Sequence, residues 1–86
     1  MSTIEISLKN LTPQQAEAAR QRVIKMLNNS DFPLCDVSEM EESGDCITFD
    51  VQPIEGLDET EMDSMEDFIL DIFAGADDIT IRQIEF

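Results

Sequence analysis

Two segments of the chain carry the same helix-start pattern, and they fix where its helices begin. At the first, Thr12 can cap the helix and Gln15 completes a capping box around a first-turn proline. At the second, Asp58 is the cap and Glu61 closes the box. Apolar residues then recur at spacings of three and four, which is typical of an amphipathic helix. We therefore expect two helices, the second of them ending at Gly75.

Strand patterns fill the segments outside these helices. Apolar and polar residues alternate over residues 3–9 and 47–52, which is the period of a half-buried strand. A weaker strand pattern runs from Leu34 to about Glu42, and a Ser-Gly-Asp turn joins it to the clearer strand as a hairpin. In the C-terminal strand, the apolar residues change phase near Arg82-Gln83, which predicts a β-bulge there.

The resulting order is strand, helix, strand, strand, helix, strand. This order is that of the α+β ferredoxin-like fold, βαββαβ, in which two helices pack on one face of a four-stranded antiparallel sheet. A chain of 86 residues supports one modest core, because a domain of this size buries only about 60% of its unfolded surface. We therefore expect a single acidic α+β domain over residues 1–86.

Location and cysteine chemistry follow from what the sequence lacks. No apolar run reaches the roughly 18 residues of a membrane span, and the N-terminus does not resemble a secretory signal. Cys35 and Cys46 do not have the spacing of a zinc or redox motif, so we expect two reduced thiols and no metal. These features favour a cytoplasmic protein.

The residues needed for catalysis and for nucleic-acid binding are missing. The chain has no histidine, and its three glycines form no phosphate-binding loop. The acidic segment 58–71 lacks the central glycine of a calcium loop. The chain also has no Tyr or Trp to stack on bases, and Phe49 is predicted to point inward. We expect no enzymatic activity, no cofactor, no bound metal and no direct binding of nucleic acid.

Charge is the most informative feature for function. The formal net charge is −15, and residues 31–78 contain seventeen acids and no Lys or Arg. Acids on the outer face of the second helix stand three and four residues apart, a spacing at which like charges destabilise a helix. The carboxylates predicted to contact a partner form two sets, one on the helix and one on the hairpin: Glu59, Asp63, Glu66, Asp67 and Asp71, and Glu39, Glu41, Glu42 and Asp45.

Small size, extreme acidity and missing catalytic residues make the chain resemble the DNA-mimic inhibitors of bacteriophages and mobile elements, the anti-CRISPR and anti-restriction proteins. The resemblance implies a non-enzymatic inhibitor that blocks the DNA- or RNA-binding surface of a host defence nuclease complex. Its partner would be a basic nucleic-acid-binding protein, in the bacterial host's cytoplasm if a phage encodes it. Such an inhibitor would associate quickly and in a salt-sensitive manner.

A second interpretation remains open at this point. The chain is also consistent with a small structural or regulatory protein-interaction module, a monomer or a homodimer, whose acidity serves solubility. Partner identity and oligomeric state do not follow from the sequence.

Overall fold

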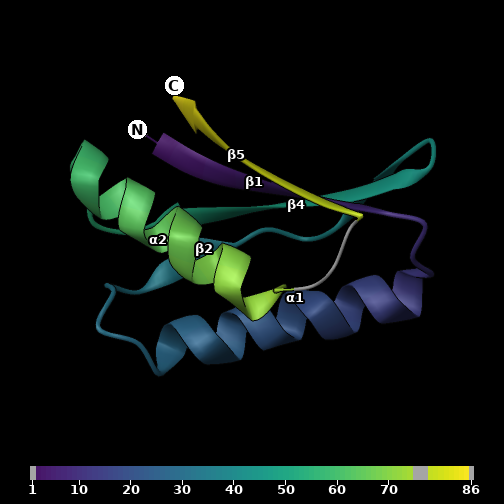
Figure 1. Ribbon diagram of the computed structural model, residues 1–86, viewed down its shortest axis with the longest axis horizontal. Helices are drawn as coiled ribbons and strands as arrows, with labels where there is room; N and C mark the ends of the chain where they lie inside the picture. The colour runs from purple at the N-terminus through teal and green to yellow at the C-terminus, as the bar shows by residue number, and fades with distance from the viewer. Residues whose placement is uncertain (1, 75–77, 86) are drawn as a thin grey trace.

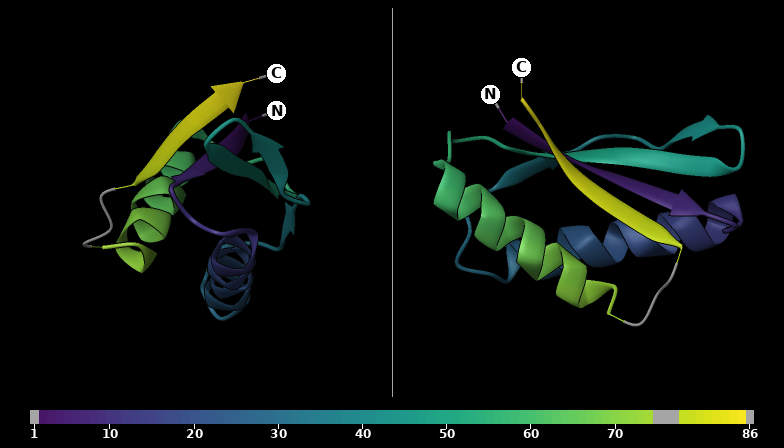
Figure 2. Two further views of the ribbon diagram at one scale, coloured as in Figure 1. Left: turned by 90° about the vertical axis from the view of Figure 1, so that its right-hand side faces the viewer. Right: turned by 45° about the horizontal axis from the view of Figure 1, so that its top comes forward.

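The computed structural model describes residues 2–74 and 78–85, and these form one sheet covered by two helices (Figure 1). In chain order the elements are β1 (Ser2–Lys9), α1 (Pro13–Asn28), β2 (Cys35–Val37), β3 (Glu41–Ser43), β4 (Cys46–Pro53), α2 (Glu59–Ile72) and β5 (Ile79–Glu85). Both helices lie on the same side of the sheet (Figure 2), so the predicted α+β class is confirmed.

Both predicted helix starts are confirmed. The backbone N–H of Gln15 donates to Thr12 Oγ1 at 3.2 Å, and the Thr12 N–H donates to Gln15 Oε1 at 3.0 Å. The N–H of Glu61 likewise donates to Asp58 Oδ1 at 2.8 Å, which completes the cap of α2. These bonds satisfy backbone donors that a helix leaves open at its first turn. The predicted stop at Gly75 lies outside the described residues.

The sheet is antiparallel throughout, with strand order β2-β4-β1-β5, and β3 pairs with β4 beyond the end of β2. The prediction of four strands is therefore wrong, because the segment predicted as one strand from Leu34 to Glu42 forms two short strands. Both lie beside β4, which brings the number of strands in the sheet to five.

A bulge divides the predicted second strand. Val37 pairs with Val51 and Glu41 pairs with Thr48, so three residues on one side face two on the other. Ser38 fixes the bulge, because its N–H donates to the Asp50 carbonyl oxygen at 2.9 Å and its Oγ accepts from the Asp50 N–H at 2.8 Å. The extra residue reverses which side chains face the helices beyond this point.

The bulge predicted near Arg82-Gln83 is absent, and β5 keeps one unbroken register against β1. Gln83 takes a helix-facing position opposite Ile4, and its amide Nε2 donates to Asp63 Oδ1 at 2.6 Å and to Glu66 Oε2 at 3.0 Å. A polar residue fits at this position because α2 supplies it with acceptors. Ile84 consequently lies on the other face of the sheet.

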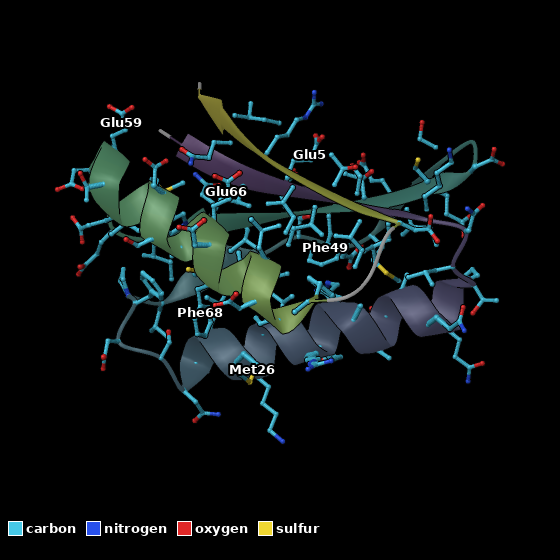
Figure 3. All side chains as sticks on the ribbon, viewed as in Figure 1. Glu5, Met26, Phe49, Glu59, Glu66 and Phe68 are labelled. Atoms are coloured by element: carbon cyan, nitrogen blue, oxygen red, sulfur yellow. The ribbon has the colours of Figure 1, made fainter. Side chains whose placement is uncertain are left out.

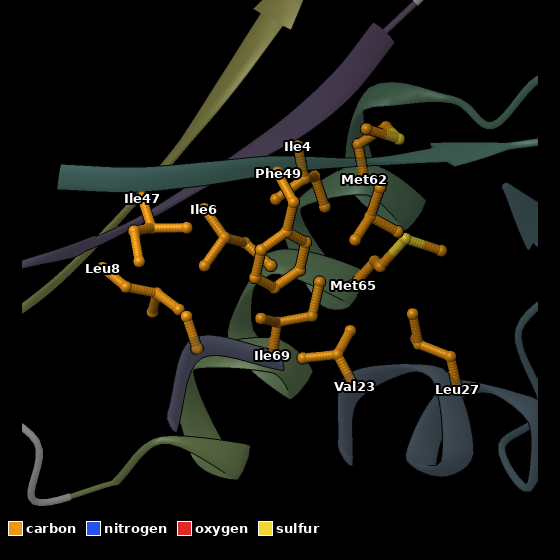
Figure 4. Close-up of a cluster of buried hydrophobic side chains, with 12 residues drawn as sticks. Ile4, Ile6, Leu8, Val23, Leu27, Ile47, Phe49, Met62, Met65 and Ile69 are labelled. Atoms are coloured by element: carbon orange, nitrogen blue, oxygen red, sulfur yellow. The ribbon is translucent and has the colours of Figure 1, made fainter. Parts of the chain in front are cut away.

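The core lies between the sheet and the helices (Figure 4). Phe49 is 1% exposed and points toward the helices, as predicted. Buried aliphatic residues of β1 and β4 surround it, and both helices contribute one apolar face: Ile4, Ile6, Leu8, Ile47, Val51, Val23, Leu27, Met62, Met65 and Ile69. Met26 stands three residues after buried Val23, a spacing typical of the apolar face of a helix, but it is exposed.

Thr3 is a buried polar residue on the face of the sheet away from the helices, because it alternates with helix-facing Ile4 along β1. It is 3% exposed, and its Oγ1 has no hydrogen-bond partner among the described residues. Since a buried hydroxyl without a partner costs about 1–3 kcal/mol, we expect Thr3→Val to raise the free energy of unfolding by about 1 kcal/mol. Urea unfolding checks this, with exposed Thr80→Val as the control. Equal effects of the two substitutions would contradict the assignment.

Candidate acidic interaction surface

The five predicted carboxylates of α2 form a continuous acidic row along the helix. Four of them are exposed and Glu66 is half-buried. Figure 3 shows Glu59 at the start of the helix and Glu66 further along it, near the sheet. Gln83 holds Asp63 and Glu66 together through the two hydrogen bonds from its single amide nitrogen. A residue of β5 therefore fixes the spacing of two carboxylates on α2.

No basic side chain neutralises the α2 row within residues 2–74 and 78–85. The ion pairs described join Arg20 to Glu17 at 3.2 Å and Arg82 to Glu5 at 2.8 Å, and neither includes a residue of α2. The row therefore has no basic partner among the described residues. Like charges at this spacing lower the stability of a helix by a few tenths of a kcal/mol per pair. Helix stability alone therefore does not explain why α2 carries this row.

The hairpin carboxylates do not form one cluster. Glu41 stands opposite Thr48, on the sheet face away from the helices, whereas Glu42 stands opposite buried Ile47. Glu42 and Asp45 line a hollow beside the start of α1. Glu39 and Glu41 instead line a hollow on the opposite face of the sheet. The bulge accounts for this division, because it decides which side of the sheet each side chain takes.

The α2 row and the hairpin lie toward opposite ends of the molecule. Figure 1 shows the start of α2 at one end of the long axis and the β3–β4 turn at the other. The Cα positions extend 33 Å along this axis. The two predicted sets are therefore separate surfaces rather than one site.

The structure adds two carboxylates, Glu5 and Asp50, that were not among the predicted contacts. Glu5 and Asp50 are direct cross-strand neighbours on the face of the sheet away from the helices. Glu5 pairs on its other side with Arg82, but Asp50 Oδ1 is buried and has no hydrogen-bond partner among the described residues. Together with Glu39 and Glu41, these two carboxylates line a hollow of about 430 Å³.

Alternation along the strand predicts that the side chains of Asp50 and Phe49 point to opposite faces of the sheet. Its position beside Glu5 depends on the register between β1 and β4, which no local pattern in the sequence reveals. The bulge then brings Glu41 to the same hollow. Glu5 and Asp50 were not predicted as a cluster, because they lie on different strands and become neighbours only when β1 and β4 pair.

The crowding at this hollow raises the pKa of the Asp50 carboxyl. Burial is the largest cause, followed by the charges of Glu5 and Glu41. Because the folded-state pKa lies above the unfolded-state pKa, ionised Asp50 lowers stability at neutral pH. Protonation removes this cost as the pH falls through the folded-state pKa.

Asp50→Asn is therefore expected to raise the free energy of unfolding at pH 7 by about 0.2–1 kcal/mol, the range for like charges on facing strands. This advantage over the parent should shrink as the pH is lowered through the raised pKa. Urea unfolding at several pH values measures it. Asp36→Asn is the control, since Asp36 faces Gln52 rather than a carboxylate, and a similar gain there would contradict the cause given.

Both cysteines are free and half-buried. Burial, and secondly the charge of Asp36, raise the pKa of the Cys35 thiol. A raised pKa keeps the thiol protonated and lowers its nucleophilicity at neutral pH. The thiol of Cys35 donates to the carbonyl oxygen of Pro33 at 3.4 Å.

The described residues contain neither a cluster suited to a metal ion nor a helix suited to span a membrane. No group of three or more His, Cys, Asp or Glu side chains there could hold a metal ion. Neither α1 nor α2 is long and apolar enough to cross a membrane.

Comparisons with known proteins bear on the fold. No family model and no curated protein matches the chain. The chain is similar to a solved structure described as "De novo designed protein Foldit4", with a TM-score of 0.65 and 14% sequence identity. The match covers 99% of this chain and 97% of the designed one. At this identity the likeness shows the fold alone: a small α+β domain.

Proposed function

We propose that this protein is a non-enzymatic inhibitor that occupies the nucleic-acid-binding surface of a basic partner, with carboxylates in place of phosphates. The observation that carries the proposal is the α2 row, whose carboxylates are exposed or half-buried and unpaired with any base of the described residues. An uncompensated row of one sign attracts a Lys- and Arg-rich surface and speeds association with it.

The dimensions of the molecule support the same proposal. A DNA duplex carries one negative charge per about 1.7 Å of its axis, and one helical turn spans about 34–36 Å. The long axis of this protein extends 33 Å, with acids of α2 toward one end and acids of the hairpin toward the other. A channel that holds one turn of duplex is therefore long enough to contact the α2 row together with Glu42 and Asp45, the hairpin acids beside the start of α1.

The target class that fits best is a host defence nuclease complex in the cytoplasm, of the kind that anti-CRISPR and anti-restriction proteins inhibit. The scaffold is proposed to be a variant of the ferredoxin-like topology, in which the bulge at Ser38 divides the second strand. The division of the second strand into β2 and β3 would then be a local change within the ferredoxin-like topology.

Capture of the partner from a bacterial lysate tests this function. The immobilised protein is expected to retain a nuclease or nucleic-acid-binding complex, which moderate salt releases and the complex's own DNA or RNA displaces. Salt sensitivity follows because exposed charges are screened at a Debye length of about 8–10 Å. A partner that remains bound in high salt and is not displaced by nucleic acid would instead show that this protein is a structural or regulatory module.

A further inference from the structure

Two large aliphatic side chains are exposed side by side at one end of the sheet. Leu34 is 67% exposed and Ile54 is 56% exposed. The Ile54 N–H donates to the Leu34 carbonyl oxygen at 3.0 Å, which extends the β2–β4 register by one further pair. Facing residues of an antiparallel pair have Cβ atoms about 4.5–5.5 Å apart. Leu34 and Ile54 therefore form one apolar contact point, termed here the aliphatic pair.

Both helices lie on one side of the sheet (Figure 2), and strand alternation places the aliphatic pair on the other side. Cys35 and Val37 pack against the core, so the alternating Leu34 and Asp36 point the other way. Ile54 likewise follows the buried Pro53. We call this uncovered side the open face.

The open face carries acids in line with the aliphatic pair. Asp36 is the next residue of β2 that points to the open face, and Ser38 follows it two residues later. The Ser38 N–H donates to the carbonyl oxygen of Asp50, which is the cross-strand neighbour of Glu5. The hollow of about 430 Å³ beside them is also lined by Met40 and Thr48. Such a hollow can accept the carbon stem of a Lys or Arg side chain along its apolar wall and the charged head at its carboxylates.

We propose that the open face is a docking surface for a partner segment in which an apolar side chain stands beside Lys or Arg. The aliphatic pair receives the apolar side chain, and the hollow at Asp50 receives the cation. Charge complementarity decides the occupant, since both of the described basic residues that contact lining residues are already paired. Arg82 is paired with Glu5, and Arg20, which donates to the Ser38 carbonyl oxygen, is paired with Glu17. A second copy of the chain docked by its own open face would place acids against acids, so that arrangement does not fit.

The inference rests on the proposed function in one respect, that the partner is basic. It adds that contact buries an apolar side chain, whose contribution to the affinity is not screened by salt as that of the charges is. A few well-packed, desolvated side chains carry most of the binding energy in known interfaces.

A nuclear magnetic resonance titration tests the proposal with a defined probe. The probe is a short blocked peptide of lysine and arginine with one central leucine, and a second peptide carries serine in place of the leucine. We expect amide shifts centred on β1, β2 and β4. The leucine peptide should bind at least about tenfold more tightly than the serine peptide.

The variant Leu34→Gln with Ile54→Thr should remove this tenfold preference for leucine. Leu70→Gln is the matched control, because Leu70 is an aliphatic residue of α2 that is 46% exposed. Exposed substitutions shift stability by less than about 0.5 kcal/mol, and thermal unfolding checks that each variant folds.

Three results would overturn the inference. Shifts confined to α2, with no preference for leucine, would remove the open face and leave the proposed function standing. Equal loss of preference in the Leu70→Gln control would show that the aliphatic pair is not the contact. The absence of salt-sensitive binding by either peptide would count against the inference and the proposed function together.

Discussion

Reversing two charges on α2, in the variant Asp67→Lys with Asp71→Lys, is expected to weaken binding to the basic partner by about a thousandfold. Both residues are exposed, and neither takes part in an ion pair described in the structure. Placing like charges across an interface costs several kcal/mol, and about 4 kcal/mol corresponds to a thousandfold. Calorimetry or surface plasmon resonance with the captured partner measures the change.

The matched control reverses two other exposed acids, in the variant Asp31→Lys with Asp78→Lys. It changes the net charge by the same amount but leaves the α2 row and the hairpin intact. We expect its affinity to fall far less, by no more than about tenfold, because only the long-range attraction is reduced. Equal losses in the two variants would show that net charge alone, and not the α2 row, determines binding.

Phe49→Ala is expected to lower the free energy of unfolding by about 3–5 kcal/mol, the range for aromatic residues removed from a core. Phe49 is the largest fully buried side chain among the described residues and lies among side chains from both layers. A domain of this size has a total stability of only about 5–15 kcal/mol. The variant should therefore be partly unfolded at 37 °C, which circular dichroism and urea unfolding measure.

Phe32→Ala serves as the control for this loss. Phe32 is half-buried and contacts Phe68 edge-on, with ring centroids 5.6 Å apart. An aromatic pair of this kind contributes about 0.5–1.5 kcal/mol beyond its buried area. We expect a cost of less than half that of Phe49→Ala, and a larger cost would place the centre of the core at the loop rather than at the sheet.

The helices and the direction of Phe49 could be predicted because their signals are local. A capping box needs only residues three apart, as between Thr12 and Gln15, and alternation along one strand sets which residues share a face. The acidic row on α2 follows from the same helical periodicity.

The errors arose where one segment meets another. The bulge after β2 depends on the contacts of Ser38 with Asp50, and the unbroken register of β5 depends on acceptors that α2 offers to Gln83. Neither contact leaves a pattern within its own segment. The cluster around Asp50 was missed for the same reason, since it forms only when β1 and β4 pair.

Competition in solution tests the central claim most directly. The captured complex is loaded with its own fluorescent duplex, and the protein is added while the anisotropy of the duplex is recorded. If carboxylates replace phosphates, the duplex is fully displaced, and the amount of protein required rises in proportion to the duplex concentration. A complex that holds duplex and protein at the same time would contradict the account.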